Sequence, residues 1–491
     1  MISNLSGQQE TLFHRTIKSG FWVFSLRIIN QLFQLVRTII LARLLSPDDF
    51  GLFGIALLTL SALDTFSQTG FYQPLIQKKE DTAPYLNTAW TVQIIRGLLI
   101  ALVLFFIAPY VAIFFKSPPA VPILKIIGFA IILQSFTNIS VIYFEKELRF
   151  NKYFAYQLFG TIADLIVSLT AAFLLRSVWA LVFGLLAGNL VRCVMSYVIS
   201  AYRPRFQFNK TQIKELFEFG RWILGSNILV FLITHGDDIF VGKLLGTIML
   251  GFYQMAYKIS NMPATEITNV ISLVTFPVYS KLQDNLTRLK EAYLKVLQFT
   301  AFLSFPIAGL IFVLAPDFTK IFLGEKWMPM VPAMQVLAWW GVIRGLVGAI
   351  SPVFMAIGKP KIVTHMQAVQ TLLLMGLIYP LTVHWNIFGA SLSVFLSALA
   401  MFFIRNHILI KTINCKISEF YKTMVIPMVL TLVCIFLILI LKNLVIQSIN
   451  IYSFIFFIGI FILVFGLLVY NIDKFLDYKL RIIIKEIIRS L

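Results

Sequence analysis

The sequence predicts an all-α membrane protein with about fourteen transmembrane helices, arranged as two parallel six-helix repeats followed by two C-terminal helices. The first reason is composition: 59% of the 491 residues are apolar and 13% are charged, which is far from the balance of soluble globular domains. The second is that apolar runs of about 20 residues, the length that crosses a bilayer, recur along almost the whole chain. The third is an internal similarity at a fixed offset of 200 positions.

Short polar segments separate the apolar runs, and each run is expected to form one span. The run that follows the polar opening segment is too long and too polar for the core of a signal peptide, so the first span is expected to remain in the protein. The expected spans begin near Ile17, Phe50, Asn87, Val121, Tyr153, Ser177, Leu216, Ile248, Ala292, Met328, Ile362, Ile387, Val425 and Ile451.

The basic residues predict the orientation of the chain. A net charge of +19 is compatible with a nucleic-acid partner, but the lysines and arginines alternate between loops and do not form one patch. One set of span ends holds 26 basic residues and the opposite set holds eight. By the positive-inside rule, this bias predicts a multi-pass protein of a bacterial cytoplasmic membrane with both termini in the cytoplasm and no nucleic-acid partner.

The repeat defines the expected domains. Between residues 20 and 56, nine of 37 positions are identical to the residue 200 positions later, including Gly20 with Gly220, Trp22 with Trp222 and Gly51 with Gly251. Six helices return the chain to the same side of the membrane, so the repeats are expected to have parallel topology with a substrate site between them. The expected parts are an N-lobe at 1–210, a C-lobe at 211–415, two further spans at 416–472 and a cytoplasmic amphipathic tail at 473–491.

The first span carries a polar stripe. Charged side chains inside a span cost about 2.5 to 3.5 kcal/mol each on insertion scales, so each needs a partner, a wet cavity or a route to the interface. At 100° per residue the stripe covers an arc of about 120°. A seam of interhelical hydrogen bonds is one explanation. Because the span has no acid, we favour a cavity lining that binds anions. The stripe residues proposed to contact substrate are Arg27, Asn30, Gln31, Gln34 and Arg37.

Two later spans carry polar faces as well. The seventh span holds His235, Asp237 and Asp238, which are candidates for binding a coupling ion such as H⁺ or Na⁺. A structural ion pair between Asp238 and Lys258 remains an equally good explanation. The eighth span presents one face of candidate substrate-binding residues, whose aromatic rings are suited to stacking on sugars: Tyr253, Tyr257, Lys258 and Asn261.

Two more ionisable residues lie within spans. Arg344 of the tenth span has no acid near it in the sequence, which is compatible with either a cavity position or a buried pair. Asp64 of the second span is expected to neutralise Arg27 or Arg37, with ion coupling as the alternative role.

No motif of an enzyme is present. The sequence has no histidine pair at zinc-binding spacing, no phosphate-binding glycine loop and no serine, histidine and aspartate set at a usable position. The three cysteines, Cys193, Cys415 and Cys434, also lack metal-ligand spacing. We therefore expect a protein that is not an enzyme and that has no metal and no cofactor beyond a coupling ion.

Several segments resemble the Wzx-type polysaccharide flippases, which belong to the MATE-like exporter superfamily. The likeness covers most of residues 15–410 and is closest to the branch with colanic and teichuronic acid exporters. The segments that carry it are LLSPDDFGLFGIA at Leu44–Ala56, FEKELRFNKY at Phe144–Tyr153, FGRWILGSNIL at Phe219–Leu229, LGFYQMAYKISNMP at Leu250–Pro263, FPVYSKLQ at Phe276–Gln283 and FLGEKW at Phe322–Trp327.

That resemblance implies a V-shaped, two-lobed bundle that moves an undecaprenyl-diphosphate-linked oligosaccharide from the cytoplasmic to the outer leaflet by alternating access through a cationic cavity. It also implies glycosyltransferases and a polysaccharide polymerase as partners. Two alternatives remain at this stage: a cation-coupled multidrug exporter, which needs acids facing its substrate, and a lipid II flippase.

Overall fold

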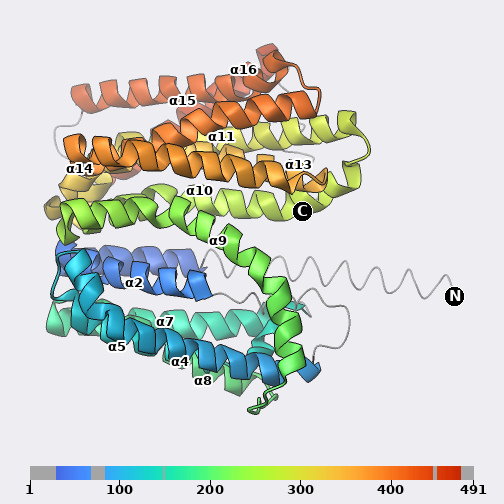
Figure 1. Cartoon of the computed structure of the whole chain (residues 1–491). Helices are drawn as coiled ribbons and strands as arrows, with labels where there is room; N and C mark the ends of the chain where they lie inside the picture. Colours follow the sequence, from blue (N-terminus) through green and yellow to red (C-terminus); the bar gives the residue numbers. More distant parts are fainter. Residues whose placement is uncertain (1–28, 68–82, 147–149, 446–449, 477–491) are drawn as a thin grey trace. The chain divides into compact units, whose positions relative to one another are not determined.

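The computed structural model is helical throughout its described part and falls into two units, at 1–251 and 252–491 (Figure 1). The boundary lies after the fifth residue of helix α10 (Thr247–Leu282), and each unit is described by itself. The expected tail lies outside the described residues from position 477 onward. The structure describes residues 29–67, 83–146, 150–445 and 450–476.

The described part of the first unit consists mainly of long helices. A helix at residues 29–44 precedes those that carry labels in Figure 1. The others are α2 (Pro47–Ser67), α4 (Ala83–Phe114), α5 (Ala120–Ser135), a 3₁₀ turn η1 (Ile139–Val141), α6 (Ile142–Lys146), α7 (Phe150–Leu175), α8 (Trp179–Ile199) and α9 (Lys210–Leu245).

The start of α2 follows from its sequence. Ser46 and Asp49 form a reciprocal capping box: the Asp49 amide donates to Ser46 Oγ at 3.2 Å, and the Ser46 amide donates to Asp49 Oδ2 at 2.9 Å. Pro47 occupies the first helical position, where its missing N–H costs no hydrogen bond. Local sequence alone therefore determines where α2 begins.

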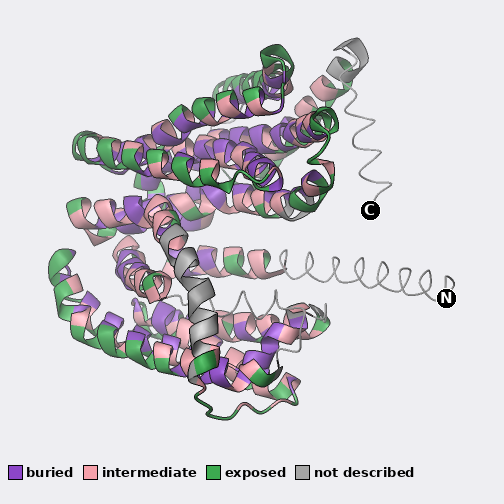
Figure 2. Ribbon diagram, turned by 45° about the vertical axis from the view of Figure 1, so that its right-hand side comes forward, coloured by how far each residue is buried: buried purple, intermediate pink, exposed green. Residues whose placement is uncertain are grey.

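Small residues set the packing of α7 against α8. A Cβ on Gly184 would lie 2.5 Å from Asp164 Oδ1 and 2.6 Å from Ser168 Cβ. A Cβ on Gly188 would lie 3.0 Å from the carbonyl oxygen of Gly160. Small residues of this kind let membrane helices approach closely. Figure 2 shows the result, with buried residues where helices meet and exposed residues along their outer faces.

The second unit continues with α10 and further long helices. They are α11 (Leu286–Phe318), a π-helical turn η2 (Thr319–Leu323), a 3₁₀ segment η3 (Glu325–Met330), α12 (Val331–Gly348), α13 (Ile350–Ala356), α14 (Pro360–Thr412), α15 (Ile417–Val445) and α16 (Ile451–Leu476).

Helix α14 is two helices that meet at a break. A straight helix of 53 residues would be about 80 Å long, more than twice the hydrocarbon core of a bilayer. Trp385 and Asn386 have non-helical backbone angles, and a Cβ on Gly389 would lie 1.9 Å from the Leu381 carbonyl oxygen. The residues on the two sides of the break therefore lie against each other, in agreement with separate spans expected from Ile362 and Ile387.

Helix α11 packs against both α12 and α15. A Cβ on Gly309 would lie 2.4 Å from Thr431 Cγ2 of α15. Lys442 of α15 donates to the Val313 carbonyl oxygen at 3.0 Å and forms an ion pair with Asp317, which is 3% exposed. An apolar cluster joins the C-terminal helices to α11: Val313, Leu314, Cys434, Ile435, Ile438, Phe457 and Phe461.

The membrane-protein prediction is confirmed, since nine helices within the described ranges are long and apolar enough to cross a bilayer. Several helices begin before the apolar run from which a span was expected. For example, α9 begins at Lys210, where Asn209 accepts hydrogen bonds from the Thr211 and Gln212 amides, and not at Leu216. Hydropathy predicts which part of a helix lies in lipid, whereas the capping residue determines where the helix starts. The expected lobe boundary near residue 210 stays a prediction.

Candidate functional site

The polar face of the first span contains an ion pair. Arg37 Nη2 lies 2.9 Å from Asp164 Oδ1 of α7, and Arg37 Nε donates to Ser168 Oγ at 3.1 Å. The two charged side chains are 16% and 21% exposed. Arg37 is therefore half of a largely buried pair, and its contact with substrate stays a prediction.

The other residues of that face differ in exposure. Gln34 is exposed, whereas Asn30 and Gln31 are half-buried. Asn30 Oδ1 is enclosed and has no hydrogen-bond partner in the described part of the chain. Arg27 lies outside the described residues. Some residues of the stripe therefore pack against neighbouring helices, whereas Gln34 is open to a polar ligand.

Asp64 pairs with a residue that the sequence analysis did not single out. Arg96 of α4 forms an ion pair with the Asp64 carboxylate, and its Nε donates to the Ser67 carbonyl oxygen at 3.0 Å. Asp64 was expected to neutralise Arg27 or Arg37. The ion pair found for Arg37 is to Asp164 instead, because α7 and not α2 presents the nearest acid.

Three ionisable residues cluster near the end of α9. Asp237 is 1% exposed, and its Oδ1 accepts a hydrogen bond from the Asp238 amide at 3.0 Å. His235 Nδ1 lies 3.4 Å from Asp238 Oδ2. His235 and Asp238 meet because residues three positions apart lie on the same face of a helix.

In the second unit, aromatic rings connect α10 to a cation on α12. The ring centroids of Tyr257 and Trp340 are 5.2 Å apart, and the Arg344 guanidinium lies 5.5 Å from the Trp340 ring. Arg344 is half-buried, and the described residues offer it no carboxylate within ion-pair distance. A guanidinium over an aromatic face keeps its hydrogen-bond donors available for a planar anion.

The remaining α10 candidates have different surroundings. Lys258 is exposed, and Asn261 is 3% exposed with its Nδ2 donating to the Tyr257 carbonyl oxygen at 3.1 Å. Asn261 Oδ1 has no hydrogen-bond partner among the described residues. Tyr253 has no exposed surface, so its ring is a packing residue in this conformation and does not offer a face to a sugar.

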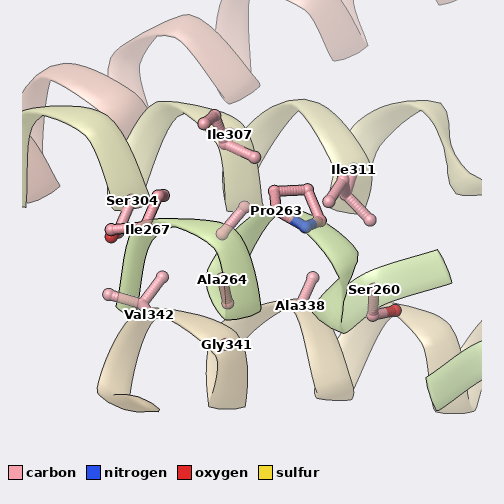
Figure 3. A pocket seen from close by; sticks show the side chains of 11 residues that line it. Ser260, Pro263, Ala264, Ile267, Ser304, Ile307, Ile311, Ala338, Gly341 and Val342 are labelled. Atoms are coloured by element: carbon pink, nitrogen blue, oxygen red, sulfur yellow. The ribbon is translucent and has the colours of Figure 1, made fainter. Parts of the chain in front are cut away.

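A small pocket lies beside this group, between α10, α11 and α12 (Figure 3). Pro263 lies in it, and proline in mid-helix cannot donate the usual backbone hydrogen bond. Ile307 and Ile311 of α11 face it from one side and Gly341 of α12 from the other. The pocket has room for about one water molecule, so it is a packing gap at a proline and not a substrate site.

Asp164, Arg96 and Trp340 were not among the residues predicted from the sequence to form the site, yet each contacts one that was. Asp164 lies four positions before Ser168 on α7, and a Cβ on Gly184 or Gly188 of α8 would contact the Asp164 side chain. An acid among glycines within an apolar span is a sequence signal for a close helix contact. Which arginine reaches that acid depends on helix neighbours, which spacing along the chain does not reveal.

Comparison with known proteins identifies the family. A family model described as "Polysaccharide biosynthesis protein" matches residues 40–332. The lipopolysaccharide biosynthesis protein WzxC of Escherichia coli strain K12 is 24% identical over 74% of this chain and 74% of its own length. The teichuronic acid biosynthesis protein TuaB of Bacillus subtilis strain 168 is 25% identical over 74% of this chain and 75% of its own length.

Solved structures show the same fold. The lipid II flippase MurJ in an inward closed conformation superposes with a TM-score of 0.73 at 15% identity, over 94% of this chain and all of that one. An inward-facing multidrug resistance transporter of the MATE family gives a TM-score of 0.60 at 16% identity, over 80% of this chain and 98% of that one. At such identities the likeness concerns the fold alone.

These findings agree with the resemblance noted from the sequence segments. The family model covers more than half of the chain, and the fold is that of multi-span transporters. The protein is therefore a multi-pass membrane transporter and not an enzyme. The chain belongs to the polysaccharide biosynthesis family of Wzx-like transporters.

Proposed function

We propose that this transporter is a flippase that moves an undecaprenyl-diphosphate-linked oligosaccharide from the cytoplasmic to the outer leaflet by alternating access. Such a substrate has an anionic, strongly hydrated head that hydrocarbon excludes and a polyprenyl tail that remains in lipid. The protein must therefore shelter the head and compensate its charge while leaving the tail outside. The names of the relatives WzxC and TuaB, which refer to the biosynthesis of surface glycans, support this substrate class.

Arg344 and its aromatic neighbours carry the proposal. A half-buried guanidinium without an acid partner in the described part of the chain is costly within a membrane unless an anion compensates it. Arginine binds phosphate through two parallel N–H donors, which suits a diphosphate. Tyr257 beside Trp340 adds ring surface for a sugar. We assign the same anion-contacting role to Arg27, and polar contacts with the head to Gln34, Lys258 and Asn261.

A membrane potential favours the proposed direction. With the inside negative, outward movement of an anion gains about 2.3 kcal/mol per charge for each 100 mV. We propose that any coupling ion, H⁺ or Na⁺, acts at the α9 group of His235, Asp237 and Asp238, in which Asp238 contacts the His235 ring and Asp237 accepts from the Asp238 amide. Asp237→Asn is then expected to remove the dependence of transport on that ion's gradient without removing substrate binding.

We place the protein in a bacterial cytoplasmic membrane with both termini inside, as the distribution of basic residues favours. The proposed partners are the glycosyltransferases that assemble the lipid-linked glycan and the polymerase that consumes it. Neither partner needs to contact this transporter directly, because the lipid-linked glycan itself passes from one protein to the next.

The binding of undecaprenyl diphosphate to the purified protein tests the proposal. Arg344→Gln is expected to weaken binding about tenfold to a hundredfold, since a hydrogen bond to a charged group contributes about 1.5–3 kcal/mol. Arg344→Lys should retain part of the affinity because lysine keeps the charge but not the planar pair of donors. Arg176→Gln is the matched control, because this exposed arginine lies between α7 and α8 of the first unit and is not among the residues proposed to contact the substrate.

Three results would contradict the proposal. Equal affinity of the wild type and Arg344→Gln, together with normal export of surface polysaccharide in cells, would remove Arg344 from substrate binding. Resistance to cationic dyes without a glycan phenotype would favour a multidrug exporter. Replacement of an essential lipid II flippase in growing cells would favour a peptidoglycan precursor as substrate.

A further inference from the structure

The segment that connects α8 to α9 is extended and held firmly by the first unit. Residues 200–209 contain no helix, and Asn209 caps the start of α9. We call residues 200–209 the linker. In Figure 2 it is the loop at the foot of the picture, coloured mostly as exposed. An extended segment lacks the backbone hydrogen bonds of a helix, so contacts with neighbouring elements largely determine its position.

Asn87 of α4 is the centre of those contacts. Its Oδ1 accepts hydrogen bonds from the Tyr202 hydroxyl at 2.7 Å and from the Arg205 amide at 2.9 Å. Its Nδ2 donates to Gln207 Oε1 at 3.2 Å. The Gln207 amide donates to Thr91 Oγ1 at 3.0 Å. One asparagine thus fixes three points of the linker against the beginning of α4.

A second set of contacts fixes the start of the linker. Asn138 Nδ2 donates to the Tyr202 carbonyl oxygen at 2.7 Å, and Ser140 Oγ lies 2.7 Å from Ser200 Oγ. The ring of Phe206 lies 4.9 Å from that of Trp90, which is buried on α4. The linker backbone and the side chains on one face of the linker therefore contact other elements of the first unit.

The outward side chains of the linker are aromatic and basic. Phe206 is 69% exposed and Phe208 is 63% exposed. Arg203 and Arg205 are exposed as well. Arg203 donates to the Ser200 carbonyl oxygen at 2.6 Å, whereas the Arg205 guanidinium has neither an ion pair nor a hydrogen bond within the described ranges. The linker thus presents two rings and two guanidinium groups in a fixed position.

The location of this surface indicates its partner. The linker begins where α8 ends and lies beside the start of α4, and both helices are long and apolar enough to cross a membrane. It therefore lies at the level where the spans leave the hydrocarbon, where aromatic rings settle among headgroups and basic side chains meet phosphates. If only water covered the linker, the rings of Phe206 and Phe208 would remain exposed to it at a position that hydrogen bonds hold fixed.

We propose that the linker binds anionic phospholipid headgroups at the membrane surface, with Arg203 and Arg205 contacting the phosphate and Phe206 and Phe208 inserted beside the acyl chains. This inference goes beyond the proposed flippase function, because it concerns a bulk membrane lipid and not the transported one. Charge complementarity favours an anionic headgroup over a zwitterionic one. Because the linker connects α8 to α9, the bound lipid anchors the start of α9 at the membrane surface.

The test measures phosphatidylglycerol bound to the full-length protein by native mass spectrometry, with phosphatidylcholine as the reference lipid. The wild type is expected to retain phosphatidylglycerol preferentially. Arg203→Gln together with Arg205→Gln should weaken that binding about thirtyfold, which is about fivefold for each cation near an anionic surface. The matched control is Lys116→Gln together with Arg176→Gln, which changes the charge equally at two exposed residues outside the linker and should retain the wild-type affinity.

A second measurement keeps the proposal testable if the arginine variants fold poorly. Phe208→Cys carries a fluorophore at a largely exposed position, and lipids brominated near the headgroup should quench it. Unchanged lipid affinity in the linker variants, or absence of quenching, would overturn the proposal. So would displacement of phosphatidylglycerol by inorganic phosphate, which would indicate a site for free anions. Dissociation of a dimer in the linker variants would assign the surface to a second copy of the chain.

Discussion

Gly51 and Gly251, which are equivalent positions of the sequence repeat, make a reciprocal contact within the first unit. A Cβ on Gly51 would lie 1.9 Å from the Thr247 carbonyl oxygen, and a Cβ on Gly251 would lie 2.0 Å from the Pro47 carbonyl oxygen. Pro47 and Thr247 are themselves separated by the repeat offset of 200 positions. The Thr247 hydroxyl also donates to the Asp48 carboxylate. Residues 200 positions apart therefore contact each other at the starts of α2 and α10.

Gly51→Ala is expected to lower the melting temperature of the detergent-solubilised protein. The added methyl group meets backbone and not a movable side chain, and overpacking of this kind costs about 1–3 kcal/mol. Gly376→Ala and Gly466→Ala are controls, because nothing lies within 4 Å of a Cβ at either helical position. A wild-type melting temperature for Gly51→Ala, measured beside these controls, would show that α2 and α10 are not in tight contact.

The pair of Arg37 and Asp164 should behave as a structural unit. Removal of one member leaves the other charge unpaired within the membrane, which costs about 3 kcal/mol for a mostly buried pair. We therefore expect Arg37→Gln and Asp164→Asn each to lower the amount of folded protein in membranes, and the double variant to recover part of the loss. Thermal unfolding of all four proteins provides the double-mutant cycle.

A different result would assign Arg37 to substrate. In that case Arg37→Gln would abolish polysaccharide export at normal protein abundance, and adding Asp164→Asn would not restore it. The cycle thus separates the ion-pair role from the anion-binding role that the sequence suggested for this arginine.

The ion pair of Lys442 and Asp317 should hold the two C-terminal helices to α11. Asp317 is almost completely buried, so Lys442→Met leaves an uncompensated carboxylate at a cost of about 3–5 kcal/mol. Cys434 reports the outcome, because its thiol is 1% exposed within the apolar cluster between these helices. With Cys193 and Cys415 replaced by serine, maleimide labelling of Cys434 should accelerate in Lys442→Met. Combining Asp317→Asn with Lys442→Met should slow it again, and equal labelling in all variants would exclude this role.

Asn87 should limit the access of a protease to the linker. Asn87→Ala removes three side-chain hydrogen bonds, each contributing about 0.5–1.5 kcal/mol. Trypsin is then expected to cleave after Arg205 faster than in the wild type. Thr170→Ala is the control, since that hydroxyl bonds only to the Ile166 carbonyl oxygen of its own helix. If both variants are cleaved at the wild-type rate, Asn87 does not fix the linker.

The helical segments and the family were accessible from the order of residues. Apolar run length is a property of consecutive residues, and it separated the two halves of α14 at Ile387 although the structure joins them across a break of two residues. The family likeness came from short segments such as Leu44–Ala56, whose turn and cap residues are also local. The membrane orientation follows the same logic but stays a prediction.

The ion pairs were not accessible in this way. Arg37 has Asp64 27 positions away in the sequence and Asp164 127 positions away, yet it contacts Asp164. Tyr253 and Tyr257 lie one helical turn apart on α10, yet Tyr253 is enclosed while Tyr257 meets Trp340 of α12. Partner choice depends on which helices are neighbours and how each is rotated about its axis, and neither is encoded in hydropathy.

Residue order was therefore enough to establish a multi-span helical transporter and its family, because hydrophobic length, capping and short motifs act between residues close in the chain. Folding in three dimensions decided that Arg37 and Asp64 each lie in an ion pair, that Arg344 rests on Trp340 without a carboxylate in the described part of the chain, and that Asn87 holds the linker. Charged and polar side chains pair with groups that lie close to them in space, and the packing of the helices determines which groups are close.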